Sequence, residues 1–427
     1  MTLVFILFGI FLILGMPVAF AIGIAGFVFF LQQPHLPLTL PVQLILSETQ
    51  NFNLLAIPMF VFAGNLMNET GITQRLMRFA SVLTGHMYGG LAQVSVVLST
   101  LMGGVTGSSI ADASMEARIL GPTMTEKGYN RGYTAAVHAF SSLITIAIPP
   151  GIGLVLYGSI GEVSVGRLFA GGLVPGLLMA LFFGITVSIT SRKKGYLPER
   201  EKRAPLKEIL PEFAHSLWAI LFPFLLIFAL RFGWLVPSEA GAFASVYALV
   251  VGIVAYRELK WDNFKRCVKS TIADIGMIMF LIALSALVSY GLKWEMIPQQ
   301  LTQALLGISS SPSVIFALIL VFLLILGMFI DSTVIILLLT AILVPIARQL
   351  GLDLVYFGVI MVITCATGLL TPPVGLTMYA VCSIMECSVA DFMKEGWPFL
   401  VSLIIVIALI VLFPQLILFV PNLLFGT

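Results

Sequence analysis

Twelve apolar blocks separated by short polar loops make up most of this sequence, and they limit what the chain can fold into. Hydrophobic residues account for 59% of the chain and charged residues for 10%, whereas a soluble domain carries about 25% charged residues. One membrane crossing needs roughly 20 apolar residues, so the chain has room for about ten crossings. The pattern predicts an all-α polytopic membrane protein and excludes a soluble enzyme, a nucleic-acid-binding protein and a large extramembrane domain. The blocks span residues 2–15, 17–31, 53–67, 89–123, 132–159, 169–191, 217–234, 237–256, 272–292, 312–349, 354–385 and 397–424.

The second half of the sequence repeats the first at an offset of 223 residues. Within the windows 104–180 and 327–403, every proline of one matches a proline of the other, which indicates an internal duplication. The most polar stretch of the chain separates the two copies, so we expect a first repeat over 1–191, a cytoplasmic linker over 192–212 and a second repeat over 213–427. The matched prolines are Pro122 with Pro345, Pro149-Pro150 with Pro372-Pro373, and Pro175 with Pro398.

The positions of lysine and arginine predict the orientation of the chain, because cytoplasmic loops are rich in both. Seventeen of the 22 basic residues fall on one side, which is therefore cytoplasmic. Arg118 lies inside an apolar block, and the other four, Arg167, Arg231, Lys293 and Arg348, fall on the opposite side.

This distribution holds only if two long blocks, 89–123 and 312–349, each enter and leave the membrane on the same side. Each therefore predicts a re-entrant helical hairpin. If block 2–31 divides into two crossings at Gly15-Met16-Pro17, each repeat has about five transmembrane helices and one hairpin. An odd number of crossings inverts the second repeat relative to the first, which is typical of secondary transporters.

Four places in the sequence force irregular backbone at membrane depth, where it is tolerated only if it is buried or lines a site. Two are the hairpin tips, at 103–114 and 327–335, and two are the proline pairs at 146–153 and 368–375. A proline pair removes two backbone donors and frees carbonyl oxygens, which together with serine and threonine hydroxyls suit a hard monovalent cation. Helices that begin after the tips direct N–H groups at a carboxylate. The alternative is that the prolines only kink their helices.

Several polar side chains in the apolar blocks allow more than one reading. Asp112 either caps its helix or belongs to a site, and Glu116 and Arg118 pair with each other or with a neighbour. Asp331 either binds a cation or caps the following helix, and we favour the cap, while we expect Glu239 to cap a helix. The hydroxyls just before the proline pairs, on Ser141, Ser142 and Thr364, either bond a carbonyl of the preceding turn or contribute to the site.

Enzyme motifs are absent from the sequence. It contains no GxxxxGK[ST] for a nucleotide, no HExxH for zinc and no GxSxG elbow. Its four cysteines form no CxxC and, with four histidines, no metal-ligand cluster. We therefore expect no enzymatic activity and no cofactor, and energy must come from an ion gradient or from another chain.

Five stretches spanning nearly the whole chain carry a resemblance to a known family. They are LLAIPMFVFAGNLMNETGI (54–72), GSSIADAS (107–114), the IPP break (148–150), PSEAGA (237–242) and TGLLTPPVG (367–375). In order and spacing the sequence resembles the large membrane subunit of the tripartite ATP-independent periplasmic (TRAP) transporters, within a superfamily of elevator-type carriers.

The resemblance implies Na⁺-coupled uptake of a carboxylate-bearing organic solute across the bacterial inner membrane. It also implies two partners, a periplasmic solute-binding protein and a small four-helix membrane subunit, which we expect to be a separate chain. Sialic acid, a C4-dicarboxylate, a sugar acid and a keto acid all remain open as the solute.

Carried over by motif, the resemblance also suggests site residues between the hairpin tips and the breaks. The run MEAR (115–118) departs from the family's small apolar residues. The expected Na⁺ ligands are Gly104, Gly107, Ser108, Ser109, Ile148, Pro149, Pro150, Gly327, Asp331, Ser332, Thr333, Gly368, Thr371, Pro372 and Pro373. The expected substrate-binding residues are Ser108, Ser109, Asp112, Thr145, Ser332, Thr333 and Thr377.

Two other functions compete with a TRAP subunit. One is a stand-alone ion-coupled symporter or antiporter of the same superfamily, which would need no binding protein. The other is a membrane enzyme or a purely structural subunit, against which the missing motifs argue. For a carrier, we expect an elevator in which 89–159 and 312–385 move together against a frame of 17–31 and 237–256, with hinges at 68–87 and 291–307.

Overall fold

The computed structural model describes all residues except Asn51, Gly104, Thr106, Ser310 and Thr427. The side chains at positions 52, 53, 302, 305, 306 and 308 are also outside the description. Gly104, one of the expected Na⁺ ligands, therefore lies outside the described residues.

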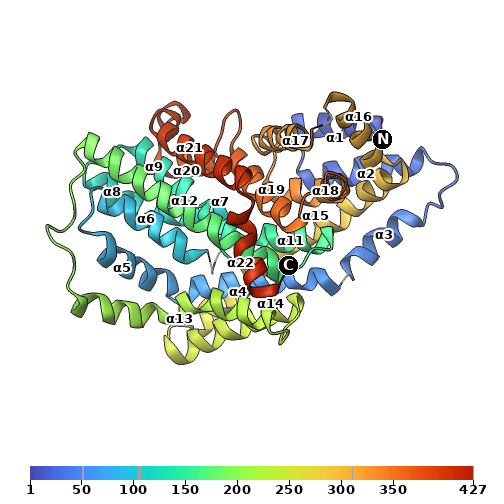
Figure 1. Ribbon diagram of the computed structural model, residues 1–427. Helices are drawn as coiled ribbons and strands as arrows, with labels where there is room; N and C mark the ends of the chain where they lie inside the picture. The colour runs from blue at the N-terminus through green and yellow to red at the C-terminus, as the bar shows by residue number, and fades with distance from the viewer. Residues whose placement is uncertain (51, 104, 106, 310, 427) are drawn as a thin grey trace.

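Every regular element in the described part of the chain is a helix (Figure 1). Helices satisfy their own backbone hydrogen bonds, which apolar surroundings require. The first half contains α1 (Thr2–Ile13), α2 (Val18–Leu31), α3 (Leu40–Thr49), η1 (Phe52–Leu55), α4 (Ala56–Glu69), α5 (Ile72–Thr84), α6 (Gly90–Met102), α7 (Ser109–Ile119), α8 (Gly121–Glu126), α9 (Arg131–Ser141), α10 (Ile144–Ala147), α11 (Ile152–Gly161) and α12 (Val165–Lys194). The second half contains α13 (Leu206–Arg231), α14 (Pro237–Val250), η2 (Val251–Ala255), α15 (Trp261–Trp294), α16 (Ile297–Ile308), α17 (Pro312–Gly327), α18 (Ser332–Gln349), α19 (Leu354–Gly368), α20 (Leu376–Met385), α21 (Val389–Leu412) and α22 (Gln415–Phe425).

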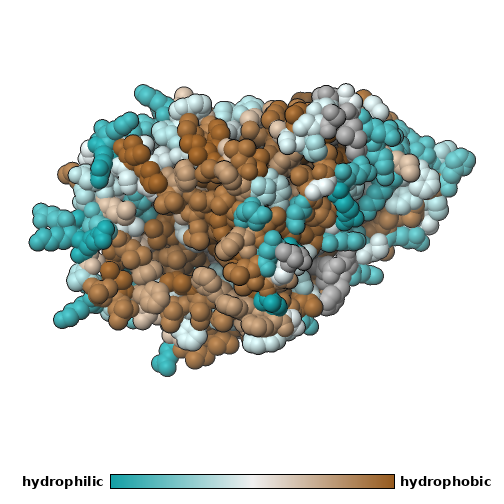
Figure 2. Space-filling model, in the orientation of Figure 1, coloured by the Kyte–Doolittle hydropathy of each residue, from teal (hydrophilic) through white to brown (hydrophobic). Residues whose placement is uncertain are grey.

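The chain is a multi-pass membrane protein, as its composition predicts. Among the described residues, seven helical segments are long and apolar enough to cross a membrane. Figure 2 shows a broad hydrophobic area across the middle of the molecule, with hydrophilic side chains gathered at its left and right ends. The segments are Arg131–Gly161, Val165–Lys194, Leu206–Arg231, Pro237–Ala255, Trp261–Trp294, Ser332–Gln349 and Val389–Leu412.

The interruptions that the sequence indicates are present in the helices. The first block divides into α1 and α2 around Gly15, whose φ of 77° suits glycine. Each expected hairpin consists of two helices, α6 with α7 and α17 with α18, and each proline pair separates two helices.

Three helices occupy stretches that we did not expect to be helical. The helices α3, α5 and α16 lie in the polar stretches between apolar blocks, where the hydrophobic pattern is weak. In α5, Ile72, Leu76 and Phe79 are buried and lie on one face, so half of this polar segment packs inward. The linker also differs, because α13 begins at Leu206 and the irregular stretch is only 195–205.

Corresponding positions in the two halves begin equivalent helices. Asn130 caps α9 by accepting hydrogen bonds from two backbone N–H groups, and Asp353 caps α19 in the same way. These two caps are 223 residues apart, the offset of the sequence repeat. The bonds Pro149-Pro150 and Pro372-Pro373, separated by the same offset, are both cis.

The helices pack as two groups. In the first, α2 and α4 pack against α15, and α4 also packs against α14. In the second, α9 packs against α20 and α21, α7 against α20, and α17 against α19, while α12 packs against α6, α10 and α21. The groups meet where α18 contacts α15 and where α11 contacts α4.

Ion pairs at one end of the molecule join loops that the charge distribution assigns to the same side. Arg75 Nη2 lies 2.7 Å from Glu258 Oε1, Arg131 Nη1 lies 3.0 Å from Glu386 Oε2, and Lys127 pairs with Glu199. Each pair therefore joins two segments that the charge distribution assigns to the cytoplasmic side.

This arrangement predicts how single cysteines will react with a membrane-impermeant thiol reagent in a cysteine-free background. Lys202→Cys and Lys260→Cys, both exposed, are expected to react only from the cytoplasm, and the exposed Gln32→Cys only from the periplasm. Labelling of intact cells compared with inverted vesicles measures this. Reaction of Lys202→Cys in intact cells would contradict the orientation.

Candidate functional site

A cavity of about 120 Å³ lies between the two hairpin tips. Residues from both tips line it, together with residues from both broken helices, while Ile278 of α15 contributes from the other helix group. Four of the seven expected substrate-binding residues, Ser108, Ser109, Ser332 and Thr333, are on its wall. The full lining is Gly107, Ser108, Ser109, Ile110, Ile146, Ile152, Gly153, Ile278, Asp331, Ser332, Thr333, Ile336, Val362 and Leu369.

The first tip packs directly against the first proline break. Gly107 has φ 58° and approaches so closely that a Cβ there would lie 2.6 Å from the carbonyl oxygen of Pro150. A Cβ on Gly103 would lie 2.5 Å from Cβ of Ile148. The expected ligands Gly107–Ser109 and Ile148–Pro150 are therefore brought together, and only glycine fits at the closest contact.

The second tip meets the second break in the same manner. The N–H of Gly375 donates to the carbonyl oxygen of Met328 at 2.8 Å. A Cβ on Gly327 would lie 3.1 Å from Cα of Gly368 and would overlap the carbonyl oxygen of Cys365. The hydroxyl of Thr371 donates to the carbonyl oxygen of Gly368 at 3.0 Å, so the expected ligands around 327–333 and 368–373 also lie together.

Helix ends of both polarities face the cavity. The helices α7, α11 and α18 begin at Ser109, Ile152 and Ser332, all of which line it. Their free N–H groups and positive dipole ends favour an anion such as a carboxylate. Ile146 and Leu369 line the cavity near the C-terminal ends of α10 and α19, whose negative dipole ends favour a cation. The same small cavity therefore suits both an anion and a cation.

The three other expected substrate-binding residues are not on the cavity wall. The Thr145 hydroxyl donates to the carbonyl oxygen of Ser142 at 2.7 Å, and Thr377 is fully buried with no hydrogen-bond partner for its hydroxyl among the described residues. Asp112 faces α6, where its Oδ2 accepts a hydrogen bond from Ser99 at 2.8 Å. The rotation of each helix about its axis, which the sequence alone does not fix, turns these side chains away.

The polar side chains that the sequence left open take different roles. Asp331 caps α18 by accepting from the N–H of Thr333 at 2.8 Å, and Glu239 accepts from the N–H of Val236 at 3.0 Å, as expected. Asp112 is not a cap, because it bonds Ser99 instead. Glu116 contacts neighbours on α6 and α9, whereas Arg118 is exposed, so the two do not pair with each other.

The hydroxyls before the proline breaks also differ in their hydrogen bonds. Ser141 donates to the carbonyl oxygen of Val137 at 2.8 Å, and Ser142 donates to that of Ala139 at 2.8 Å. Thr364 is buried, and within the described part of the chain its hydroxyl has no partner. Of these three hydroxyls, only that of Thr364 remains free to bind a ligand.

A second, larger cavity of about 410 Å³ lies beside the first. Both are bordered by α15 and α18, with Ile278 and Ile336 in the first and Ile282 and Leu337 in the second. The larger cavity also contains four charged side chains, from Glu48, Glu162, Lys293 and Arg348. Burial raises the pKa of Glu48, and Lys293 opposes that rise. We call this larger cavity the outer cavity. It places polar side chains next to the hairpin tips, on the side of Arg348.

Sequence reasoning missed one set of buried polar residues, on α6 and α9. Ser95, Ser99 and His138 are fully buried and contact the acidic residues of α7. A signal was present: Ser95 and Ser99 are four residues apart, as are Asp112 and Glu116, so each pair lies on one helix face. Which helix faces which is not readable from that spacing.

Comparisons with known proteins give one family across almost the whole chain. The family model described as the tripartite ATP-independent periplasmic transporter, DctM component, matches residues 5–416. The sialic acid TRAP transporter large permease protein SiaM of Vibrio cholerae is 34% identical over 414 residues, with 96% of each chain covered. The 2,3-diketo-L-gulonate TRAP transporter large permease protein YiaN of Escherichia coli is 31% identical, with 95% of each chain covered.

A solved structure has a similar fold. The YdaH transporter of Alcanivorax borkumensis superposes with a TM-score of 0.65 over 86% of each chain, at 12% sequence identity. At that identity the likeness concerns the fold alone.

Proposed function

Because the chain belongs to the DctM component family of tripartite ATP-independent periplasmic transporters, we propose that it carries a carboxylate-bearing organic solute into the cell with Na⁺. A periplasmic solute-binding protein delivers the solute, and a small four-helix membrane subunit completes the transporter in the bacterial inner membrane. The chain needs no cofactor and performs transport rather than catalysis.

One observation carries this proposal: two hairpin tips and two proline breaks converge on a single cavity. The three helix N-termini there suit the carboxylate, and the carbonyl oxygens and hydroxyls around the breaks suit Na⁺. Relatives are named for sialic acid and for 2,3-diketo-L-gulonate, both organic acids. A solute of that kind is the best candidate for this chain.

The size of the cavity bears on how the solute is held. A ligand pocket usually measures about 300–1,000 Å³, so a volume near 120 Å³ encloses only the carboxylate end of a sugar acid. The adjacent 410 Å³ cavity offers room for the polar remainder. Binding of the whole solute therefore requires the wall that separates the two cavities to shift. Ile336 and Leu337 of α18 and the facing turn of α15 form this wall.

We propose that the movement is of the elevator type. Two inverted repeats, each with one re-entrant hairpin, place the site in one helix group, and this group slides against the other. The hairpins, the broken helices and α12 pack together, whereas α2, α4, α14 and α15 form the opposing frame. Ile278 of α15 is the part of the cavity wall that would be left behind as the site moves.

The alternative within the same superfamily is a stand-alone symporter or antiporter. It would use the same cavity but would need neither partner. Dependence of uptake on the binding protein separates the two.

Uptake by proteoliposomes tests the proposed function. The chain is reconstituted with its small subunit, and radiolabelled sialic acid, 2,3-diketo-L-gulonate or a C4-dicarboxylate is supplied with a matching binding protein. We expect uptake of one of these acids with an inward Na⁺ gradient and none with K⁺ replacing Na⁺. Uptake at full rate in K⁺ alone would contradict Na⁺ coupling, and uptake without a binding protein would favour the stand-alone carrier.

Removing one oxygen at the breaks or tips is expected to weaken Na⁺ binding. Ser108→Ala and Thr371→Ala should each raise the Na⁺ concentration for half-maximal uptake by about tenfold, because a polar contact to a charged group contributes about 1.5–3 kcal/mol. Thr125→Ala is the matched control, since its hydroxyl bonds the carbonyl oxygen of Gly121 in α8, away from the cavity. An unchanged Na⁺ dependence in both site variants would refute the proposed oxygen ligands.

A further inference from the structure

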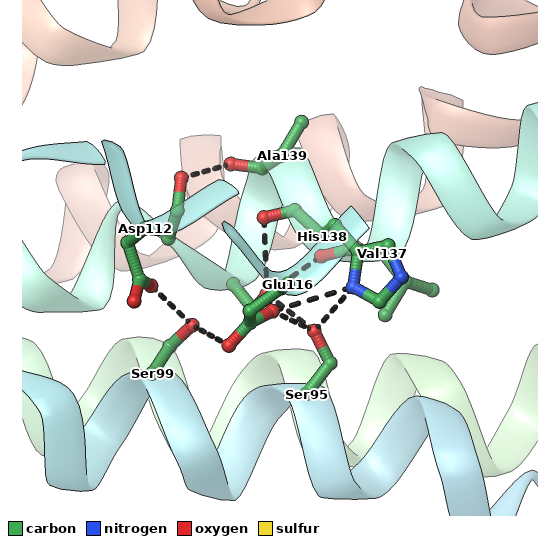
Figure 3. A network of polar contacts seen from close by, with 9 residues as sticks. Ser95, Ser99, Asp112, Glu116, Val137, His138 and Ala139 are labelled. Carbon is green, nitrogen blue, oxygen red and sulfur yellow. Dashed lines mark hydrogen bonds and ion pairs between the residues drawn. The ribbon is translucent and has the colours of Figure 1, made fainter. Parts of the chain in front are cut away.

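A fully buried polar cluster joins α6, α7 and α9 beside the first hairpin tip, outside the cavity (Figure 3). Asp112 and Glu116 of α7 point towards Ser95 and Ser99 of α6, and His138 of α9 faces the same side chains. All five have 0% exposed surface. Two acidic groups this deeply buried require compensation that nothing in the proposed function supplies.

The hydroxyl of Ser99 shows that the cluster holds an extra proton. Its Oγ lies 2.8 Å from Asp112 Oδ2 and 2.8 Å from Glu116 Oε1. A serine hydroxyl has one proton to donate, and ionised carboxylates only accept. If Ser99 donates to one acid, the other must donate to Ser99, so one of the two carboxyl groups is protonated.

Each of the two carboxyl groups has a feature that stabilises its ionised form. Asp112 is in the first turn of α7, where the positive end of the helix favours the ionised form. Glu116 lies one turn further along, where the hydroxyls of Ser95 and Ser141 donate to its Oε2. The two carboxyl groups therefore share one proton through Ser99, and Asp112 Oδ1 has no hydrogen-bond partner among the described residues.

His138 completes the cluster on the side of α9. Its Nδ1 lies 2.9 Å from Ser95 Oγ and 3.3 Å from Glu116 Oε2, while its Nε2 is buried with no hydrogen-bond partner among the described residues. A second proton on this imidazole would be buried without an acceptor at Nε2, so His138 adds no positive charge that could balance the two acids.

No permanent positive charge balances Glu116. The helices packed against α7 are α6, α8, α9, α10 and α20. His138 apart, the charged or titratable side chains of these helices, and Arg118 of α7 itself, form no hydrogen bond or ion pair with Glu116 in the described part of the chain. They are Glu126 of α8, Arg131 and Tyr133 of α9, and Tyr379 and Cys382 of α20; α6 and α10 carry none.

We propose that Glu116 is a proton-binding site that couples proton movement to transport by this chain. The carboxylate takes up a proton as its O–H bond forms, moves with the hairpin, and releases the proton to water on the cytoplasmic side as that bond breaks. When the shared proton leaves, both carboxylates are charged and repel each other across Ser99, which loosens the contact between α6 and α7. Protonation therefore controls the geometry of the first hairpin. This proposal rests on the proposed function as a carrier.

Proton influx during uptake tests the proposal in the reconstituted three-component transporter. A pH-sensitive dye is trapped in the vesicles, the membrane potential is clamped, and radiolabelled sialic acid or 2,3-diketo-L-gulonate is supplied with its binding protein. We expect substrate-dependent acidification inside. At a fixed Na⁺ gradient, each pH unit of inward proton gradient should raise the attainable accumulation about tenfold per coupled proton.

Glu116→Gln, which stays neutral, is expected to abolish the acidification and the response to the pH gradient. Glu239→Gln, which removes an acid at a helix cap, is the control and should retain both. If Glu116→Gln does not fold, Ser99→Ala replaces it, because it removes the shared hydroxyl and should change the pH at which uptake is half-maximal.

The outcomes that overturn the proposal are distinct from failure of the proposed function. Uptake by the unaltered protein without acidification overturns the proton site alone. So does a Glu116→Gln variant that loses Na⁺ influx while no proton moves in either protein, because the cluster would then hold Na⁺. No uptake of any acid under any gradient overturns the proposed function, and the proton site with it.

Discussion

Gly368→Ala is expected to lower substrate uptake by about tenfold or more, although it adds only one methyl group. A Cβ at this position would overlap the backbone of Gly327 and lie 2.7 Å from the N atom of Met328. Both neighbours are main-chain atoms, so neither can rotate away. Overpacking of this kind costs about 1–3 kcal/mol and forces α17 and α19 apart where the second tip meets its break.

Gly276→Ala is the control for this prediction. Gly276 lies in α15, and nothing lies within 4 Å of an added Cβ there. Alanine favours a helix over glycine, so this variant should keep its stability and its uptake. The two variants are compared by initial uptake rate at equal amounts of reconstituted protein. Equal rates would show that the close approach of the second tip to its break is not needed for transport.

A crosslink between the two helix groups should abolish uptake. In a background without the four native cysteines, Ser285→Cys on α15 and Thr340→Cys on α18 place one thiol on each group, both at the outer cavity. A reducible bifunctional thiol reagent then joins the proposed frame to the proposed moving group. We expect uptake to fall to background and to return after reduction.

A crosslink within the moving group serves as the comparison. Arg131 and Glu386 form an ion pair at 3.0 Å between α9 and the end of α20, so cysteines at both positions can be joined without distorting the group. Uptake should survive this crosslink. If it stops uptake while the crosslink between groups is harmless, the moving parts are assigned wrongly.

The backbone breaks of this fold were predictable because proline and glycine act locally. Pro149-Pro150 and Pro372-Pro373 cannot continue a helix wherever they pack, and Gly107 adopts a backbone conformation that other residues rarely take. The hairpins followed from the charge distribution, which depends on loops rather than on packing. These features placed the tips and breaks of the cavity before any side-chain contact was known.

Contacts between helices were not predictable in the same way. Asp112 was expected either to cap α7 or to bind substrate, but it bonds Ser99 on a neighbouring helix. Thr145 and Thr377 lie near the breaks yet point away from the cavity, because a helix can rotate about its axis without changing its sequence pattern. Within the expected hinge 68–87, the packing of α5 against α6 and α13 through its apolar face was not predicted.

The most direct test of the account asks whether the cavity between the tips opens to each side of the membrane in turn. Ile110 lies on the cavity wall and is not one of the expected Na⁺ or substrate ligands. The variant Ile110→Cys reports this opening through its reaction with an impermeant thiol reagent added to one side. We predict reaction from the periplasmic side in one condition of Na⁺ and substrate and from the cytoplasmic side in another. After crosslinking of Ser285→Cys to Thr340→Cys, Ile110→Cys should react from only one side of the membrane. Reaction from a single side in every condition, while uptake proceeds, would contradict the account.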